Sequence, residues 1–550
     1  MRDKISQQIA DICQELFSVT IQPVLSRPDE QFGDFATNVA MQLAKPVGQN
    51  PRDIANAIAE KLTEQQIAAQ VAGPGFINIT LPDAVVYAAI NPEVGVRGGK
   101  LTLEYSCPNP FKQLHVGHLY QTILGDALAR VHERLGTKVS RVTYGGDVGL
   151  HVARSMFGIL QELGGENPEN LANVPVEERA NWLAKVYVAG TQAYEQDEAT
   201  KQAITELNQR IYKLHDDNDT DSPFAQIYWQ AREWSYDYFR SFYQDLAVKP
   251  FDRFIGESDT YKTGLALVRS HMGDVFEESE GAVILSKEKS GLHTRVFITS
   301  LGLPMYETKD LGVISLEHQL FDYDQRIIMT GNEQKEYMKV VFAAMKLIDP
   351  ELGAKQSSLT HGLVKFGDGQ KMSSRLGNVT RAIDVLIVAQ SAVNAADEQT
   401  AWQIANGAVK YTFLKNSIGG DISFDLEQSI STEGNSGPYL QYALVRARSI
   451  MRDAPRVDQV DVTELNAEER RLAAWLSRYP EALEACANNS SLHELCAYLY
   501  ELSQIFNRFY ESNRVIDDPR SAIRIPLVSS YEKILSDGLT TLGIPTPEKM

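Results

Sequence analysis

The chain has 550 residues, of which 43 % are hydrophobic and 23 % charged, an ordinary globular composition that is too long for one core and predicts about three or four domains. No stretch approaches 18 consecutive apolar residues and the first residues lack an apolar leader, so we expect neither a membrane span nor a signal peptide. The net charge of −19 argues against a nucleic-acid partner, although binding depends on local patches rather than on the total.

Residues 1–95 predict a small α+β domain. An amphipathic helix comes first, two further helices follow within 27–62, and Asn50 before Pro51 is a typical helix start. The segment "QVAGPGFINITLP" reads as a turn that leads into an alternating strand. A linker rich in Gly and Pro follows.

Residues 96–395 alternate strands with helices, which predicts a parallel sheet of the Rossmann type. The order is a strand at 101–106, a loop, a helix at 118–135 and a strand at 138–147. A polar, mostly helical stretch at about 160–255 has the character of an insertion, and the sheet pattern resumes at "RIIMTG".

Residues 396–550 are amphipathic helices at 3.6-residue spacing and predict an all-α bundle. The expected fold is therefore multidomain α/β: a small α+β domain, a parallel-sheet domain with an inserted subdomain, and a helical bundle.

Two histidines flank a glycine where the first strand–loop unit enters its helix, in "HVGH" at 115–118. Free backbone N–H groups and the helix dipole make such a helix start a phosphate site, and His115 and His118 add side-chain donors on one face. Gly117 permits close approach. This suits attack on the α-phosphate of a nucleotide with departure of pyrophosphate. The alternative is that His115 only caps the helix and His118 packs in the core.

A second phosphate signal lies about 250 residues downstream, in "GQKMSSRLG" at 369–377. A glycine-rich cationic loop with small hydroxyl residues can close over a phosphate chain, where Lys371 and Arg375 would stabilise the departing pyrophosphate. Taken alone, the loop reads better as a solvated basic turn before a helix.

Together the HVGH and KMSS motifs resemble the paired signatures of class I aminoacyl-tRNA synthetases, and "LEYSCPNPFKQLHVGHLYQTILGDALARVHERLG" resembles the arginyl-tRNA synthetases. This resemblance implies an arginine-binding set of Glu104, Asn109, His115, Tyr306, Asp310 and Gln334. A guanidinium offers five donors and no acceptor, so carboxylates and oriented polar groups are what its pocket requires.

The resemblance also implies an ATP site and its catalytic residues. The ATP-binding residues are His115, Gly117, His118, Gly331, Glu333, Lys371, Met372, Ser373 and Ser374, and the catalytic residues are His115, His118, Lys112 and Lys371. Ser374 stands where the class carries a second lysine; we expect Lys112, three residues before the first histidine, to take over its contact with the phosphates. The wording "GGDVGLH" also departs from the family pattern, which leaves the role of Asp147 open.

Two regions are expected to bind tRNA. The N-terminal domain resembles one that grips the tRNA elbow, with Phe76 and Asn78 as base contacts, although Phe76 reads almost equally well as strand core. The bundle resembles an anticodon-binding domain with an aromatic and cationic series: Tyr439, Gln441, Tyr442, Arg446, Arg448 and Arg452.

We therefore expect a cytoplasmic, monomeric arginine–tRNA ligase whose partners are L-arginine, ATP with Mg²⁺, and tRNA(Arg). No metal site or structural zinc is expected: no CxxC pair occurs, and Cys496 reads as a small core residue rather than as a ligand with Cys486 and His493. Two rivals remain, a shorter nucleotidyltransferase with the same histidine motif and a non-catalytic RNA-binding relative.

Overall fold

The computed structural model describes residues 1–366, 381–457 and 462–550, and the chain divides into two compact units. The first unit comprises 1–94, 443–483 and 497–537, and the second comprises 95–442, 484–496 and 538–550. Each unit therefore combines segments that are far apart in the sequence. Within the described residues, no helix is both long and apolar enough to cross a membrane.

The N-terminal part of the first unit is an antiparallel sheet with the strand order β1-β2-β4-β3, covered by helices. Asn50 caps α3 as predicted, since its Oδ1 accepts the Arg52 N–H at 2.9 Å. The elements are α1 (Arg2–Phe17), β1 (Leu25–Ser26), η1 (Glu30–Phe32), β2 (Phe35–Thr37), α2 (Val39–Val47), α3 (Pro51–Glu64), β3 (Ala68–Ala72), β4 (Phe76–Thr80) and α4 (Asp83–Ala88).

Helices from the C-terminal region complete the first unit. Arg470 of α20 forms ion pairs with Asp34 and Asp83 at 2.9 Å each, so this helix is tied to the N-terminal part. The C-terminal helices of the chain are α19 (Gly437–Asp453), α20 (Ala467–Leu476), α21 (Tyr479–Asn489), α22 (Leu492–Ser512) and α23 (Ser521–Thr541). Their regular spacing of buried apolar residues confirms the predicted helical bundle.

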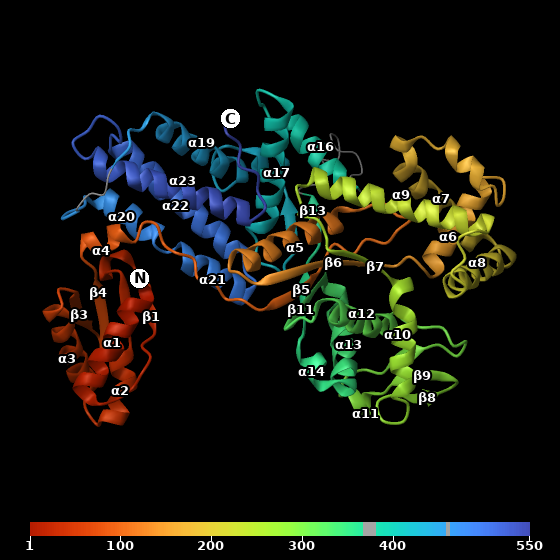
Figure 1. The fold of residues 1–550 in the computed structure, drawn as a ribbon, viewed down its shortest axis with the longest axis horizontal. Helices are drawn as coiled ribbons and strands as arrows, with labels where there is room; N and C mark the ends of the chain where they lie inside the picture. The colour runs from red at the N-terminus through yellow and green to blue at the C-terminus, as the bar shows by residue number, and fades with distance from the viewer. Residues whose placement is uncertain (367–380, 458–461) are drawn as a thin grey trace. The chain divides into compact units, whose positions relative to one another are not determined.

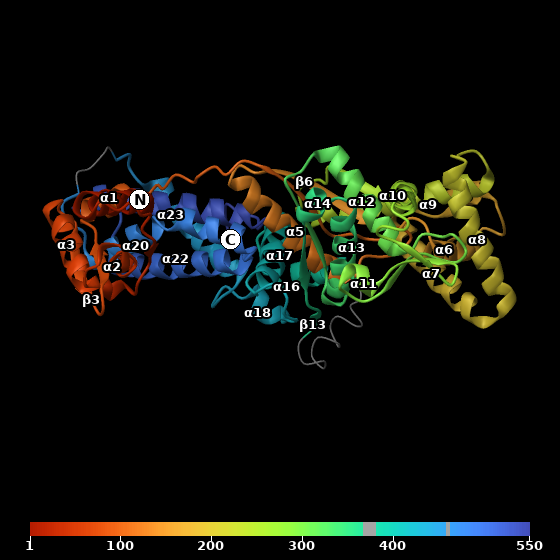
Figure 2. The same ribbon diagram turned by 90° about the horizontal axis from the view of Figure 1, so that it is seen from below.

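The second unit is built on a parallel sheet whose described strands run in the order β12-β11-β5-β6-β7. Helix α5 packs against the sheet on one side, while α12 and α13 lie beside β5, β11 and β12 (Figures 1 and 2). This order reverses direction at β5, and such a point is where doubly wound sheets bind ligands. The elements are β5 (Lys100–Glu104), α5 (Val116–Arg134), β6 (Lys138–Gly145), β7 (Arg253–Gly256), α12 (Tyr306–Phe321), β11 (Gln325–Gly331), α13 (Lys335–Ile348) and β12 (Gln356–His361).

The predicted insertion between β6 and β7 is helical and has a hydrophobic core of its own. Asp147 anchors it to the sheet: the carboxylate accepts the Ser258 N–H at 2.9 Å and the Ser258 hydroxyl at 2.7 Å, and it pairs with Arg232 at 2.9 Å. Asp147 is thus a structural residue. The elements are α6 (Leu150–Glu162), η2 (Pro168–Asn173), η3 (Val176–Glu178), α7 (Arg179–Gln196), α8 (Glu198–Asp216) and α9 (Pro223–Asp245).

Several short elements follow that hydrophobic periodicity does not predict, because they are too short to show a period. They include an antiparallel sheet of β8, β9 and β10 and a parallel pair of β13 and β14. The remaining elements of the second unit, which also include the longer helix α10 and the predicted helix α17, are α10 (Glu257–Ser270), β8 (Glu277–Ser279), β9 (Ala282–Leu285), α11 (Lys287–Ser290), β10 (Arg295–Ile298), η4 (Asn332–Gln334), α14 (Pro350–Ala354), β13 (Val364–Phe366), α16 (Ala382–Ala392), α17 (Glu398–Leu414), β14 (Ile422–Phe424) and α18 (Leu426–Ile430).

Candidate active site

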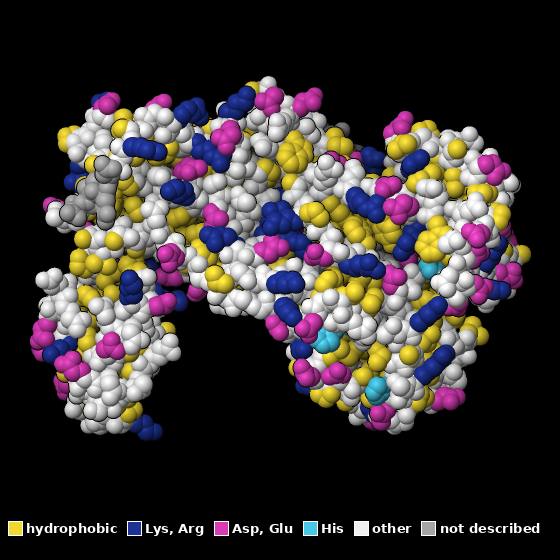
Figure 3. Space-filling view, in the orientation of Figure 1, with side chains coloured by type: hydrophobic (Ala, Val, Ile, Leu, Met, Phe, Trp, Pro, Cys, Tyr) yellow, Lys and Arg dark blue, Asp and Glu magenta, His cyan; other side chains and the backbone are white. Residues whose placement is uncertain are grey.

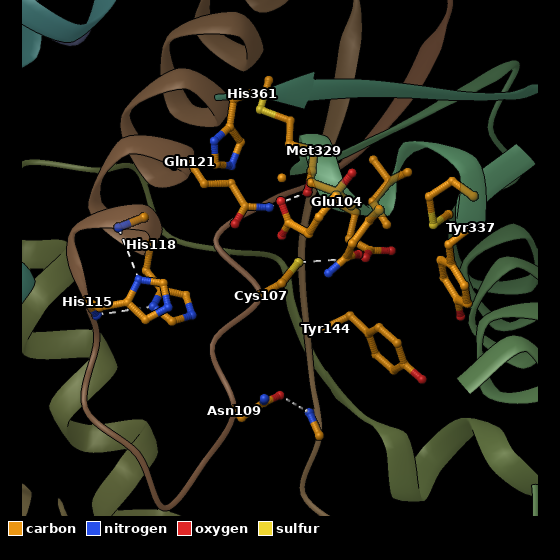
Figure 4. Close-up of a pocket in the computed structure, with 18 of the residues that line it drawn as sticks. Glu104, Cys107, Asn109, His115, His118, Gln121, Tyr144, Met329, Tyr337 and His361 are labelled. Atoms are coloured by element: carbon orange, nitrogen blue, oxygen red, sulfur yellow. Dashed lines mark hydrogen bonds between the residues drawn. The ribbon is translucent and has the colours of Figure 1, made fainter. Parts of the chain in front are cut away.

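A cavity of about 670 Å³ opens at the carboxyl ends of the parallel strands in the second unit (Figure 4). It gathers most of the residues that the sequence predicts for ATP and arginine, although they come from segments more than 200 residues apart. The predicted residues that line it are Glu104, Asn109, His115, Gly117, His118, Tyr306, Asp310, Gly331, Glu333 and Gln334.

The two histidines form the mouth of the cavity at the start of α5. His115 is the N-cap residue, and its Nδ1 accepts the Gly117 N–H at 3.1 Å. His118 reaches back, and its Nδ1 accepts the His115 N–H at 3.2 Å, which completes a capping box. The ring centroids are 3.8 Å apart. Capping and a functional role are therefore compatible, because each ring uses only one nitrogen for the cap.

This geometry sets the protonation of both rings. Burial, together with the nearby Lys112 and His361, lowers the pKa of His115, and burial and the charge of His115 lower the pKa of His118 to about 3. Both rings are neutral at pH 7. Since Nδ1 is an acceptor in each ring, the proton resides on Nε2. The mouth of the cavity therefore presents two neutral N–H donors beside the positive end of a helix dipole.

The floor of the cavity is acidic. Glu104 ends β5 and is 1 % exposed, and Asp310 projects from α12. Burial raises the pKa of Asp310 to about 7, although a hydrogen bond from the Tyr337 hydroxyl opposes this shift. Burial also raises the pKa of Glu104. Buried carboxylates in this arrangement favour a ligand that carries a positive charge.

The loop between β5 and α5 is held in a strained shape. Ser106, Cys107 and Phe111 have φ values of 70°, 47° and 66°, which side-chain-bearing residues adopt rarely. Helix α9 of the insertion supports the loop, because the Phe111 N–H donates to the Ser235 hydroxyl at 2.9 Å. Asn109 lines the cavity, and its Oδ1 accepts the Gly146 N–H at 2.7 Å, a bond that does not use its amide NH₂ (Figure 4).

Lys112 does not line the cavity in this structure. Its ammonium lies 4.5 Å from the ring centroid of Tyr187 on α7, a cation–π contact. The neighbouring Gln113 donates to Asn181 of the same helix at 2.9 Å. The insertion therefore holds the segment just before His115.

The predicted residues Lys371, Met372, Ser373 and Ser374, like Arg375, lie outside the described part of the chain. The residues on both sides of that segment are described and lie at the cavity. Gly362 and Leu363 line it, and the Ala382 N–H donates to the Leu114 carbonyl at 2.9 Å. Arg381 also forms a β-bridge with His115.

Sequence reasoning missed several residues of the cavity: Cys107, Gln121, Tyr144, His151, Glu257, Tyr337 and His361. Gln121 follows His118 by three helical positions, a spacing that could have placed it on the same face. His151 donates from Nε2 to the Gly146 carbonyl at 2.7 Å, and burial lowers its pKa to about 4, so the ring is neutral. Cys107 lies in the loop between the predicted residues Glu104 and Asn109, whereas Tyr144, Glu257, Tyr337 and His361 come from other strands and helices and carry no local signal.

The two residues predicted to contact the tRNA elbow share one side of β4. Phe76 is 42 % exposed and Asn78 is half-buried, whereas Ile77 and Ile79 between them face the core. The alternative of Phe76 as strand core is therefore not what the structure has. A ring and an amide beside each other at the surface can stack on and hydrogen-bond a base.

The predicted residues of α19 separate onto different faces of the helix. Gln441 is fully buried and its amide donates to the carbonyls of Gln403 and Pro545 at 3.0 and 2.7 Å, so its side chain packs rather than faces solvent. Tyr442 is 45 % exposed. Tyr439 is half-buried and Arg452 is exposed.

Two arginines of α19 have different surroundings within the first unit. Arg446 lines a groove of about 860 Å³ and lies 5.2 Å from the ring centroid of Tyr510, whereas Arg448 contacts Glu532 of α23 at 3.4 Å. On the face drawn in Figure 3, basic and acidic side chains are interspersed over α19 to α23. The net charge of −19 is therefore not a uniform negative field on this face.

Comparisons with known proteins agree over the whole chain. The model for the class I (R) tRNA synthetase catalytic domain matches residues 92–425, the DALR anticodon-binding domain matches 440–550, and the arginyl-tRNA synthetase N-terminal domain matches 1–81. The arginine–tRNA ligase of Idiomarina loihiensis is 30 % identical over all of both chains, and that of Bdellovibrio bacteriovorus is 27 % identical over 100 % of this chain and 98 % of its own.

The solved structure of the Thermus thermophilus arginyl-tRNA synthetase has a TM-score of 0.80 at 25 % identity and covers 100 % of both chains. These matches confirm the predicted multidomain fold and the predicted ligase activity on arginine, ATP and tRNA. The chain belongs to the arginyl-tRNA synthetase family, the class I ligases that use ATP to join arginine to its tRNA.

Proposed function

We propose that the cavity activates L-arginine with its two ends in separate roles: the histidine mouth binds the phosphates of ATP, and the acidic floor binds the guanidinium of the amino acid. The observation that carries this proposal is the joining of neutral Nε2–H donors and buried carboxylates in one cavity. Gly117, Gly331 and Glu333 line the same cavity and are assigned to ATP.

In the first step, a carboxylate oxygen of arginine attacks the α-phosphorus, and the bond from that phosphorus to the leaving pyrophosphate breaks. Negative charge grows on the phosphoryl oxygens during this exchange. The Nε2–H groups of His115 and His118 donate to these oxygens, and the N-terminus of α5 adds its dipole. Because both donors are neutral and already oriented by the capping box, they need no rearrangement as the charge develops.

In the second step, the 2′-hydroxyl of the terminal adenosine of tRNA attacks the carbonyl carbon of arginyl-adenylate. The carbon–oxygen bond to the phosphate breaks, AMP leaves, and the hydroxyl proton passes to solvent or to the departing phosphate. The tRNA contacts that support this step are assigned to Phe76 and Asn78 and to α19, with Arg446 in its groove as the best supported arginine.

For the amino acid, Glu104 and Asp310 accept N–H bonds from the guanidinium, a contact between opposite charges in a dry site. Tyr306, 57 % exposed at the cavity, and Gln334 line the same region, while Asn109 and His115 hold the α-amino and carboxylate groups. A neutral side chain would leave the carboxylates unpaired, so discrimination against it is strong.

Lys112 and Lys371 are assigned to the phosphates of ATP. Lys112 would leave the Tyr187 ring to reach them. In the described part of the chain, no group of three or more His, Cys, Asp and Glu side chains is arranged to hold a metal. We therefore assign Mg²⁺ to the ATP phosphates without dedicated protein ligands, where it would neutralise phosphate charge.

The proposal also includes the division of labour along the chain. Residues 1–95 bind the tRNA elbow, 96–395 carry catalysis with the insertion at about 160–255, and 396–550 bind the anticodon arm. Support comes from the three domain matches and from the separate sheets of the N-terminal region and of the catalytic region. A cytoplasmic monomer suits this arrangement.

ATP–pyrophosphate exchange measured across the twenty amino acids, with and without tRNA(Arg), tests the proposal. We expect exchange with arginine and a requirement for the tRNA. Exchange with a different amino acid would refute the pocket assignment. Exchange without any amino acid would point to a cofactor nucleotidyltransferase, and tRNA binding without exchange to a non-catalytic RNA-binding protein.

A further inference from the structure

Arg326 and Glu317 form a cluster with Glu104 directly behind the floor of the cavity. Neither the domain matches nor the proposed function assigns a role to Arg326 or to Glu317. Arg326 of β11 is 1 % exposed and Glu317 of α12 is 0 % exposed. The Nη2 group of Arg326 donates to Oε2 of Glu104, and its Nε group donates to Oε2 of Glu317. A single guanidinium therefore joins the carboxylate of the floor to a second carboxylate in the core.

The fold brings these groups together from three elements. In the parallel pairing of β11 with β5, Arg326 lies opposite Thr102 and Ile328 lies opposite Glu104, so Arg326 and Glu104 project from the same face of the sheet. Glu317 follows Asp310 by seven positions on α12, which places both on the helix side that covers this face. Glu104 of the acidic floor, Arg326 and Glu317 are thus adjacent, with Arg326 between the two carboxylates.

The contacts of Glu104 restrict its orientation. Oε2 is taken by Arg326, and Oε1 accepts a weak hydrogen bond from Cys107 Sγ at 3.7 Å (Figure 4). The third edge of the guanidinium, Nη1, lies 3.4 Å from Oε1 of Gln356. Glu104 lines the cavity, whereas Arg326 and Glu317 are absent from the described residues that line it. Arg326 and Glu317 therefore act on a ligand indirectly, through their contacts with Glu104 and through the charge of Arg326 near Asp310.

Arg326 also affects the protonation of the nearby carboxyl groups. Glu104 lies within Coulombic reach of Asp310 and of Glu317, and desolvation raises the pKa of all three carboxyl groups. The charge of Arg326 opposes this shift for all three. Without Arg326, protonation would relieve the repulsion, and a protonated carboxyl is a poorer partner for a guanidinium. Arg326 therefore shifts these carboxyl groups toward their ionised forms.

We propose that Arg326 and Glu317 are positioning residues of the arginine pocket, which hold Glu104 in one orientation so that its free acceptor positions receive the guanidinium of L-arginine. Glu317 contributes by accepting a hydrogen bond from Nε of Arg326, which keeps the guanidinium oriented toward Glu104. This inference rests on the proposed role of Glu104 in binding arginine.

The competing interpretation is a purely structural ion cluster. Replacing such a cluster by apolar residues of similar volume is often neutral or even favourable for stability. A purely structural role predicts that substitution changes thermal stability and affects the KM values for arginine, ATP and tRNA to the same extent, or not at all. A positioning role predicts a selective change in the recognition of arginine, with the other substrates unaffected.

The experiment measures aminoacylation by the full-length enzyme with arginine, ATP and tRNA(Arg) each varied in turn. For the double variant Arg326→Met/Glu317→Leu we expect the KM for arginine to rise at least tenfold while the KM values for ATP and tRNA stay within twofold. For the single variant Glu317→Gln, which keeps shape and volume, we expect a three- to tenfold rise, so a folded variant is available if the double variant fails to fold. Arg326→Lys keeps the positive charge and loses the planar guanidinium. Its KM for arginine should lie between that of the double variant and that of the natural enzyme.

Arg141 provides the matched control. It is an equally buried arginine of the same sheet, paired with Asp126 at 2.7 Å and with Glu133 at 2.9 Å, and it is not among the described residues of the cavity. Arg141→Lys should leave the ratio of the arginine KM to the ATP KM unchanged.

Glu104→Gln separates this inference from the proposed function. If Glu104→Gln raises the arginine KM at least tenfold and the Arg326 and Glu317 variants do not, the positioning role is refuted and the pocket assignment stands. If Glu104→Gln itself leaves the arginine KM unchanged, the pocket assignment fails, and the positioning role fails with it. A parallel rise in the KM values for arginine and ATP in the Glu317→Gln variant would also refute the positioning role.

Discussion

The mouth and the floor of the cavity handle charge in opposite ways. The mouth consists of His115 and His118, both neutral, whose protons are assigned by a capping box at the start of α5. The floor consists of buried carboxyl groups, Glu104 and Asp310, whose charge depends on an internal counter-charge and on pH. The contrast follows from the ligands that each end is proposed to receive.

A positively charged side chain is recognised before reaction, so its partners must carry charge in the resting site. Negative charge on the phosphate grows only during reaction, so neutral donors held in place serve it without repelling or trapping the substrate beforehand. The comparison teaches that recognition and catalysis in this cavity can be disturbed separately. Four measurements test that separation.

The largest effect is expected at the mouth. His118→Ala removes one oriented donor, and we expect the rate of adenylate formation to fall about 10²–10³-fold, the usual loss when a donor to a developing oxyanion is deleted. The arginine KM should change less than threefold. Pre-steady-state adenylate formation with tRNA present measures both. His293→Ala, at an exposed histidine, serves as the control; equal losses in rate and arginine affinity would abolish the distinction between mouth and floor.

The next effect is expected at the floor. Asp310→Asn preserves shape and removes one charge, so kcat/KM for arginine should fall about 10- to 100-fold, corresponding to about 1.5–3 kcal/mol for a hydrogen bond to a charged group. The ATP KM should remain within twofold in steady-state aminoacylation. A fall confined to kcat, with normal arginine KM, would place Asp310 in the chemistry instead of in recognition.

The pH dependence should differ between the two ends. The pKa of Asp310 is raised to about 7, so acidification below pH 7 protonates it and removes charge from the floor; the arginine KM should rise about tenfold from pH 8 to pH 6. His118 stays neutral over this range because its pKa is lowered to about 3, and the pKa of His115 is also lowered, so the rate at saturating arginine should change less with pH than the arginine KM does. The arginine KM of the natural enzyme and of Asp310→Asn, measured by steady-state aminoacylation between pH 6 and pH 8, checks this. The same dependence of the arginine KM on pH in the variant would contradict it.

The smallest effects are expected at Lys112 and its resting place. Lys112→Ala should lower the rate of adenylate formation about tenfold and leave the arginine KM unchanged, because the ammonium is proposed to reach the phosphates. Tyr187→Leu removes a cation–π contact of about 0.5–1 kcal/mol and should alter that rate two- to fivefold. ATP–pyrophosphate exchange in the presence of tRNA measures both, and a normal rate for Lys112→Ala would rule out its assignment.

Local patterns in the sequence were enough for the fold class, whereas most residues of the candidate site were identified through the resemblance of the motifs to a family. The helix that follows HVGH, the cap at Asn50 and the strand before Glu104 are local signals, and the structure has each of them. The separation of α19 into a buried Gln441 and an exposed Tyr442 was not predictable, since it depends on which helices pack around it. Asp147 similarly acquires its role only through Ser258 and Arg232, more than 80 residues away.

The sequence alone determined most of the helices and strands, because helix starts, glycine turns and hydrophobic periods act over a few residues, and the resemblance of its HVGH and KMSS motifs to a family indicated the chemistry. Tertiary structure decided what those residues face. Only the pairing of β11 with β5 and the packing of α12 over them place Arg326 and Glu317 behind Glu104. The reason is physical: the charge and orientation of a buried side chain are set by neighbours in space, and no period in the sequence records neighbours that are about 200 residues apart.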